Sequence, residues 1–198
     1  MKKLFVITPP SASCGGVFID AGFQEVIFPS LWEADTFLDK IGVEKERQMW
    51  TFKDRGDRNV CLIPEVTGIV QEMWRNEWSR GKGNPDRIFY VSRCYRYERP
   101  QRGRYREFTQ FGIEMLGDAN KTRQDEARDL LQLCLTDCGV DFTLNDNVKR
   151  GIGYYVQGGF EAEALNLGSQ KQIAGGGTYP EGCGWAIGID RLLLAKYG

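Results

Sequence analysis

The stretch from Arg87 to Gly117 constrains the fold of this chain most, because it reads as two strands joined by a basic loop. Side chains alternate between the two faces of a strand, so Arg96 and Glu98 would share one face of the first strand. Gln110 and Glu114 would share a face of the second strand. Pairing the strands predicts a polar floor over an apolar underside. We interpret this floor as a binding surface rather than a merely solvated face.

Two stretches of the sequence carry signals for an anion. The loop at 99–106 contains four arginines and is expected to face outward. Near the end of the chain, a glycine-rich strand at 185–189 leads into a helix that begins near Asp190 and Arg191. An arginine at a helix N-terminus favours phosphate. Glycines at 182, 184 and 188 predict that a flat ligand approaches the sheet backbone there.

The composition narrows the chemistry further. The chain has 198 residues and a net charge of −1, which indicates one domain without general adhesion to nucleic acid. It has no histidine, and its six cysteines form no C-x-x-C, so we expect no metal site and a reduced, cytoplasmic protein. The N-terminal apolar run is too short for a secretory core, and no stretch approaches a membrane span. Chemistry must therefore rest on Arg, Glu, Gln, Tyr and backbone groups.

Hydrophobic periodicity and turn residues predict a mixed α+β domain over 1–198, without the strict strand–helix alternation of a doubly wound sheet. No P-loop motif is present. The expected helices lie at 15–22, 34–42, 64–78, 122–138 and from 190 onward. The expected strands lie at 23–28, 49–53, 59–63, 140–144 and 185–189, with one more through Phe160 and two within 87–117.

Several of these stretches resemble the motifs of the class II aminoacyl-tRNA synthetases, in the order that family has them. GFQEVIFPSLWE resembles motif 1 (about 20–33), YRYERPQRGRYREFTQFGIE resembles motif 2 (about 87–117) and GWAIGIDRLLL resembles motif 3 (about 184–197). RGIGYY and AGGGTY resemble two motifs of the histidyl-tRNA synthetase branch. The resemblance implies an antiparallel sheet flanked by helices, of the class II catalytic-domain type.

The resemblance also implies an ATP site with Mg²⁺ as the accompanying metal. Arg96 would hold the α-phosphate, and Arg191 would hold the γ-phosphate and cover the adenine. Phe108 would stack on the other face of the adenine, while Glu98 and Arg104 would help to fix the nucleotide.

The amino-acid side of the pocket follows from the same resemblance. Arg150 matches the arginine that assists adenylate formation at the α-phosphate. The remaining matched residues would bind the amino acid. Glu65 and Thr67 would take its amino group, Gln110 would lie beside them, Glu114 and Tyr155 would read an imidazole ring, and Tyr154 would also contact the substrate. These roles imply formation of an aminoacyl-adenylate, with histidine as the amino acid.

The partners implied are the acceptor end of a tRNA, contacted by the loop at 99–106, and a second copy of the chain, contacted by motif 1 around Pro29. The resemblance ends with motif 3 and leaves only about thirty residues between motif 2 and RGIGYY. We therefore expect a catalytic core without the anticodon-binding and inserted domains of the family.

Some positions depart from the family pattern and leave the amino acid and its acceptor open. The departures are Ile63, Val66, Tyr97, Thr109, Gly153, Thr178 and Pro180. Three functions remain: an enzyme that activates histidine and charges tRNA, a ligase that passes the amino acid to another acceptor, and a regulatory paralogue that binds an amino acid or a nucleotide.

Overall fold

The computed structural model describes residues 6–7, 16–38, 40–81, 83–148, 153, 155–156, 159–168 and 170–198. Its main element is an eight-stranded sheet in the order β1-β2-β6-β7-β11-β10-β9-β8. The strands are β1 (Val6–Ile7), β2 (Gln24–Ile27), β6 (Arg87–Tyr95), β7 (Glu107–Leu116), β8 (Thr143–Val148), β9 (Gly159–Glu163), β10 (Gln172–Tyr179) and β11 (Gly182–Gly188). Neighbouring strands are antiparallel except β2 and β6, which are parallel.

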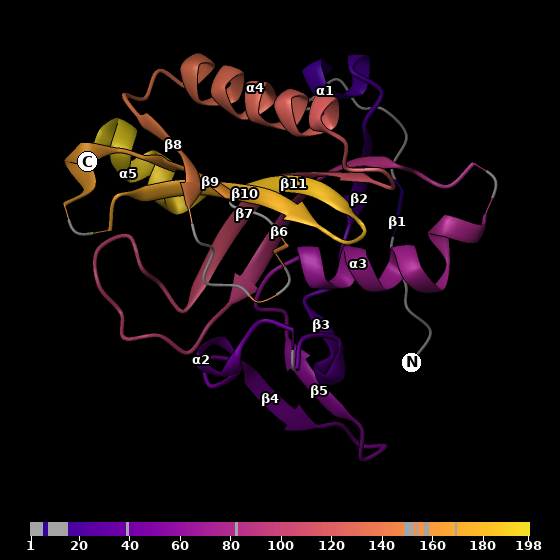
Figure 1. The fold of residues 1–198 in the computed structure, drawn as a ribbon. Helices are drawn as coiled ribbons and strands as arrows, with labels where there is room; N and C mark the ends of the chain where they lie inside the picture. The colour runs from indigo at the N-terminus through magenta and orange to yellow at the C-terminus, as the bar shows by residue number, and fades with distance from the viewer. Residues whose placement is uncertain are drawn as a thin grey trace.

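Helices cover both faces of this sheet (Figure 1). One face carries α1 (Gly16–Asp20), α4 (Lys121–Asp137) and α5 (Ile189–Tyr197), and the other carries α3 (Thr67–Asn76). Beside α3 lies a three-stranded sheet in the order β3-β5-β4. Its strands and the remaining short elements are β3 (Leu31–Glu33), β4 (Trp50–Lys53), β5 (Asn59–Leu62), α2 (Val43–Glu46), and the 3₁₀ turns η1 (Ala34–Thr36), η2 (Trp78–Arg80) and η3 (Leu165–Leu167).

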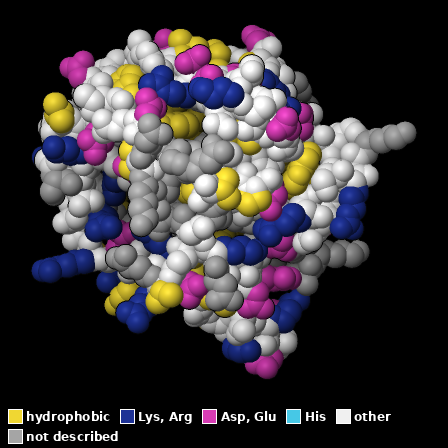
Figure 2. Space-filling model, viewed as in Figure 1, with side chains coloured by type: hydrophobic (Ala, Val, Ile, Leu, Met, Phe, Trp, Pro, Cys, Tyr) yellow, Lys and Arg dark blue, Asp and Glu magenta, His cyan; other side chains and the backbone are white. Residues whose placement is uncertain are grey.

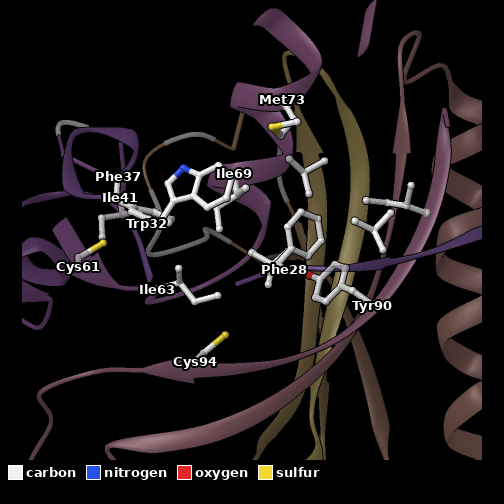
Figure 3. Close-up of a cluster of buried hydrophobic side chains, with 14 of the residues drawn as sticks. Phe28, Trp32, Phe37, Ile41, Cys61, Ile63, Ile69, Met73, Tyr90 and Cys94 are labelled. Atoms are coloured by element: carbon white, nitrogen blue, oxygen red, sulfur yellow. The ribbon is translucent and has the colours of Figure 1, made fainter. Parts of the chain in front are cut away.

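Two buried clusters, one on each face, hold these layers together. The cluster on the α3 side includes Trp32, Phe37, Ile63 and Tyr90, and it joins the small sheet to the main one (Figure 3). The cluster on the other side is centred on Trp185, whose indole nitrogen donates to the carbonyl of Ala127 on α4 at 2.7 Å. Each buried aromatic side chain of this size contributes about 2 kcal/mol of hydrophobic stabilisation. Helices and buried side chains thus cover much of both faces of the sheet.

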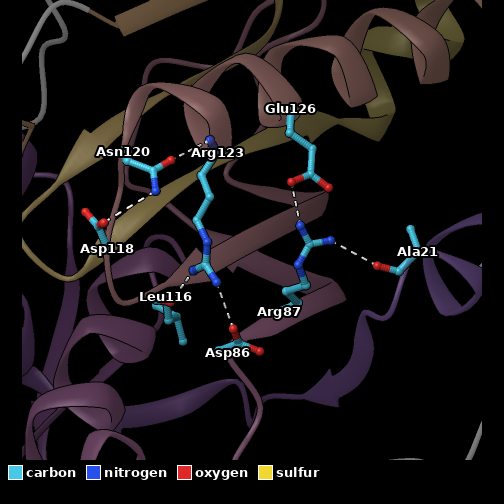
Figure 4. A network of polar contacts seen from close by, with 8 residues as sticks. All are labelled: Ala21, Asp86, Arg87, Leu116, Asp118, Asn120, Arg123 and Glu126. Atoms are coloured by element: carbon cyan, nitrogen blue, oxygen red, sulfur yellow. Dashed lines mark hydrogen bonds and ion pairs between the residues drawn. The ribbon is translucent and has the colours of Figure 1, made fainter.

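Polar contacts fasten α4 at its N-terminal end (Figure 4). The Asn120 side chain accepts from the amide of Arg123 and so caps the helix. The Arg123 guanidinium then donates to the carbonyl of Leu116 and pairs with Asp86 at 2.9 Å. Arg87 on β6 binds both the carbonyl of Ala21 and the carboxylate of Glu126 on α4. These contacts set the position of α4 over β6 and β7.

Most predicted elements occur, with corrections. The segment 34–42 is the turn η1 followed by further turns rather than a helix. Phe37 and Ile41 are buried from this non-helical backbone. The predicted strand at 140–144 is instead β8, which begins at Thr143, and α3 begins at Thr67 rather than at 64. β1, β3 and β10 are additional strands, and α2 is an additional short helix. The hairpin of β6 and β7 pairs Cys94 with Phe108 and Ser92 with Gln110.

No helix in the described part of the chain is long and apolar enough to cross a membrane. Lysine, arginine, aspartate and glutamate side chains are interspersed over the face of the molecule in Figure 2. This mixture agrees with the net charge of −1.

Candidate active site

A cleft of about 440 Å³ lies over the main sheet, where the hairpin of β6 and β7, the strands β9 and β10 and the helix α5 converge. Most of the predicted site residues that the structure describes line it. They are Glu65, Thr67, Arg96, Glu98, Arg104, Phe108, Gln110, Tyr155 and Arg191. Residues up to 126 positions apart in the sequence thus meet in one cavity, from Glu65 to Arg191. Arg150 and Tyr154 lie outside the described residues.

The strand β6 ends at Tyr95, so the two-residue alternation predicted through Glu98 is wrong beyond that point. Arg96 and Glu98 lie in the connection that follows and still reach the cleft. The Arg96 Nε donates to the carbonyl of Pro64 at 2.9 Å, and its guanidinium carbon lies 4.9 Å from the centre of the Phe108 ring. Backbone and ring contacts therefore fix this arginine before any ligand is bound.

Arg191 is held in a similar way at the start of α5. Its Nε donates to the carbonyl of Gly103 at 2.6 Å, and its Nη1 donates to the carbonyl of Gln172 at 2.8 Å. Desolvation lowers its pKa below the usual value, and the neighbouring Arg104 and Arg96 lower it further. A guanidinium that is partly buried among other cations is stabilised by an incoming anion, so this end of the cleft favours phosphate.

The basic loop does not present all four of its arginines to solvent. Arg104 forms an ion pair with the buried Glu98, and the Arg106 Nε donates to the carbonyl of Glu98 at 3.1 Å. Arg99, Arg102 and Arg106 are exposed. Of the four loop arginines, Arg104 lines the cleft and the other three lie at the surface.

The other end of the cleft has neutral and acidic groups. The Glu65 carboxylate accepts from the amide of Gly68 at 2.8 Å, in the first turn of α3. The Cys94 thiol lies 3.2 Å from Gln110 Oε1. Burial raises the pKa of Cys94 to about 12, so the thiol stays protonated and donates to the Gln110 carbonyl. This contact orients the Gln110 amide, and the sequence pattern gave no signal for it.

Glu114 does not lie on an open floor, as the strand alternation predicts, but is almost fully buried with 1% exposure. Its carboxyl group accepts from the Thr67 hydroxyl and from the Tyr179 hydroxyl, each at 2.6 Å. Tyr90 OH lies 3.4 Å away. Desolvation raises its pKa to about 8, even though these hydroxyls favour the charged form. Of Glu114 and Thr67, only Thr67 lines the cavity, so the Thr67 side chain separates the Glu114 carboxyl group from the cleft.

The glycines have a different purpose from the predicted approach of a flat ligand. A Cβ at Gly184 would lie 2.1 Å from Glu114 Oε2, and one at Gly182 would lie 2.2 Å from the carbonyl of Met115. These two glycines make room for the protein itself. Gly188 meets nothing closer than 3.8 Å and lines the cleft, so it alone of the three leaves space for a ligand.

Carboxylates for a divalent cation are also present. Glu161 and Glu163 lie two residues apart on β9, and both line the cleft. Mg²⁺ commonly takes one or two carboxylates together with substrate phosphates rather than a complete protein cage. Among the described residues, no cluster of three or more acidic or cysteine side chains could hold a metal by itself.

Comparisons with known proteins agree with this geometry. The family model for histidyl-tRNA synthetase matches residues 12–150. The histidine–tRNA ligase of Archaeoglobus fulgidus is 28% identical over an alignment that covers 88% of this chain and 68% of the relative. That of Methanocorpusculum labreanum is 34% identical over 77% of this chain and 35% of the relative. The chain thus spans about two thirds or less of the length of these relatives.

Solved structures give the same fold. The apo histidyl-tRNA synthetase of S. aureus superposes with a TM-score of 0.71 at 25% identity, covering 90% of this chain and 62% of that one. A Bacillus halodurans protein, described as an ATP phosphoribosyltransferase regulatory subunit/histidyl-tRNA synthetase, has a TM-score of 0.75 at 14% identity and covers 91% of this chain and 76% of that one. The second likeness shows the fold alone. With the class II catalytic architecture and the family match over residues 12–150, this chain belongs to the histidyl-tRNA synthetase family.

Proposed function

We propose that the protein activates histidine with ATP, forming histidyl-adenylate and pyrophosphate, and transfers the histidyl group to tRNA. The observation that carries this proposal is the convergence of Arg96, Phe108 and Arg191 with Thr67 and Gln110 in one cleft. An adenine ring and phosphates fit the first three, and an amino acid fits the last two. Family membership supports the same assignment.

The reaction needs little acid–base help, which suits a chain without histidine. The ionised carboxylate of the amino acid attacks the α-phosphorus, a new C–O–P linkage forms, and the bond to the β-phosphate breaks with loss of pyrophosphate. Arg96 would neutralise the charge that develops on the α-phosphate, with Arg191 on the departing phosphates. Arg150 would act beside Arg96. Mg²⁺, held by Glu161 and Glu163 together with the phosphates, would supply further charge neutralisation.

The amino group would lie between Glu65 and Thr67. The Thr67 hydroxyl that donates to Glu114 leaves its lone pairs toward the cleft, where they can accept from an ammonium group. Gln110, whose carbonyl accepts from Cys94, would present its NH₂ group to a substrate oxygen. Tyr154 and Tyr155 would contact the side chain, as the family resemblance implies, and Glu114 would act on the substrate from beneath Thr67.

Exchange of labelled pyrophosphate into ATP, measured with each of the twenty amino acids, tests the activation step. We expect exchange with histidine, and at least a hundredfold loss in Arg96→Ala and Arg191→Ala, since each removes a charge that stabilises the transition state. Arg93→Ala is the matched control, because Arg93 is an exposed arginine of β6, three residues before Arg96, and pairs with Glu107 outside the cleft. Absence of exchange with every amino acid would overturn the proposal and favour a regulatory paralogue.

Transfer to RNA is tested separately with a histidine tRNA acceptor minihelix. The exposed Arg99 and Arg102 would contact its phosphates, so Arg99→Ala/Arg102→Ala should reduce charging while pyrophosphate exchange continues. Exchange without charging in the wild-type protein would indicate an acceptor other than tRNA.

The assembly proposed is a homodimer formed around Pro29. The register that pairs Glu25 with Phe89 brings Ile27 beside Val91, and both of these side chains are exposed, at 47% and 56%. An apolar surface at this place suits a contact with a second copy. Sedimentation of the wild-type protein should give twice the chain mass of 22.5 kDa, and Ile27→Asp should give the single mass.

A further inference from the structure

Two cations of the cleft, Lys45 and Lys171, have no role in the activation step described so far. Lys45 lies in α2, which comes between β3 and β4 in the sequence. Its side chain lines the same cavity as Arg96, Arg104 and Arg191. Among the described residues of 31–62, the region of the small sheet, Lys45 lines this cavity and the others do not. All the other basic residues there come from the hairpin connection, from the segment before β10 or from α5.

Contacts with the hairpin arm fix the position of α2. The amide of Tyr97 donates to the carbonyl of Gln48, just beyond α2, at 2.6 Å. The Tyr97 ring lies edge-on to Trp50 with the centroids 5.0 Å apart, and the Arg106 guanidinium lies 4.3 Å above the same ring. The residues that follow α2 are therefore held against the connection between β6 and β7. Figure 1 shows α2 beside the connection between β6 and β7.

Within this frame, the Lys45 ammonium lies 3.9 Å from Glu98 Oε1. Glu98 is buried and also pairs with Arg104. Arg104 and Arg96 lie close enough to Arg191 to lower its pKa, and the charge of Glu98 opposes them. Lys45 and Arg104 thus share the single carboxylate of Glu98, and Arg191 lies within reach of its charge. A polyanion would pair with these cations more fully than one carboxylate does.

The other acidic residues of the cleft keep their negative charge and make separate contacts. Glu65 receives the Gly68 amide at the start of α3, and Asp190 receives the Thr109 amide at 2.7 Å. Glu161 and Glu163 lie on β9, where they would serve a divalent cation that accompanies the phosphates.

We infer that Lys45 is a nucleotide-binding residue that contacts the phosphate tail of ATP from the small-sheet side of the cleft. Glu98 would hold the ammonium in place while the cleft is empty, at a separation long enough for a phosphate oxygen to compete for it. Lysine suits this task, since its ammonium is a mobile point charge that can turn toward different oxygens. The inference rests on the proposed use of ATP.

The test is the calorimetric affinity for MgATP and for adenosine, the latter measured by competition with MgATP. Lys45→Met should weaken MgATP about tenfold, as expected for loss of a charge-assisted contact, and should leave adenosine unchanged. Lys45→Arg should retain most of the affinity. Lys53→Met is the matched control, because Lys53 is an exposed lysine of the same small sheet, bound to Asp57.

Each alternative outcome is distinct. Equal losses for MgATP and adenosine would mean that Lys45 only supports the fold around Glu98, and this would overturn the inference. Unchanged MgATP affinity in Lys45→Met would overturn it as well, while the activation proposal stands. If the wild-type protein itself binds no MgATP, the proposed function falls and the inference falls with it.

Discussion

Glu114 illustrates how one buried residue can differ from what its strand position predicts. Alternation along β7 puts it on the same face as Gln110, and both do point to the same side of the sheet. Gln110 reaches the cleft, whereas Glu114 lies beneath the first turn of α3, covered by Thr67. The alternation identifies the face of the sheet correctly, but only the packing of α3 decides which residues of that face are solvated.

The burial of Glu114 predicts a pH dependence of stability. The pKa of this carboxyl group is raised from 4.5 to about 8, so between these values the folded protein keeps a proton that the unfolded chain loses. This group therefore stabilises the fold below about pH 4.5 relative to higher pH, and the contribution is lost as the pH rises to about 8. Each unit of the shift corresponds to about 1.4 kcal/mol, which makes the effect a few kcal/mol.

We expect Glu114→Gln to reduce this dependence, because the amide has no proton to lose. Urea unfolding of both proteins at about pH 5 and about pH 9 gives the comparison. The wild-type protein should lose more stability across this interval than the variant does. Equal losses would show that Glu114 is ionised throughout, held by the hydroxyls of Thr67, Tyr90 and Tyr179.

At the scale of the elements, β11 shows why glycine is required at some positions of a strand and tolerated at others. Gly184 faces Glu114 and the carbonyl of Ile113, at 2.1 and 2.3 Å from an added Cβ. Gly188 ends the same strand and has its nearest neighbour at 3.8 Å. Both glycines belong to the same glycine-rich stretch of sequence, yet Gly184 is closely packed and Gly188 has open space beside it.

Gly184→Ala should therefore lower the free energy of unfolding by about 3 kcal/mol, since β7 or the Glu114 side chain must move. Gly188→Ala is the control within the strand and should change the stability by less than about 0.5 kcal/mol. Thermal unfolding followed by circular dichroism measures both. Similar melting temperatures for the two variants would contradict the close packing at Gly184.

The elements that the sequence predicts well are those with a single buried face. α4 shows it plainly, because Ala127 and Leu131 face the sheet at helical spacing and Asn120 caps the start. β10 could not be predicted in this way, because seven of its eight residues are buried and its glycines remove the alternation. The contacts of Lys45 and Cys94 could not be predicted from the sequence either, since each is made with a residue more than fifteen positions away.

At the scale of the whole molecule, the two buried clusters share one sheet. Tyr90 points into the cluster beneath α3, while Phe89 beside it points into the cluster beneath α4. Strands β6, β7 and β10 contribute to both, so neither cluster can be exposed without disturbing the same sheet.

We expect urea to unfold the protein in one transition. Trp32, Trp74 and Trp78 report on one cluster and Trp185 on the other, so Trp32→Phe/Trp74→Phe/Trp78→Phe and Trp185→Phe give fluorescence signals weighted toward opposite faces. Their midpoints should coincide with the midpoint from far-ultraviolet circular dichroism of the same variant. Separate midpoints for the fluorescence and circular dichroism signals would show that the two faces unfold independently.

The contact between Gly177 and Tyr155 also limits the order in which such a chain can diverge. A larger residue at 177 must follow a smaller one at 155, because the added Cβ would lie 2.8 Å from the Tyr155 ring. Gly184 offers no such route, since its added Cβ would also lie 2.3 Å from the backbone carbonyl of Ile113. A descendant with a new amino-acid preference would therefore change the tyrosine first and the glycine at 177 afterwards, so that one order of mutations is open and the reverse is closed.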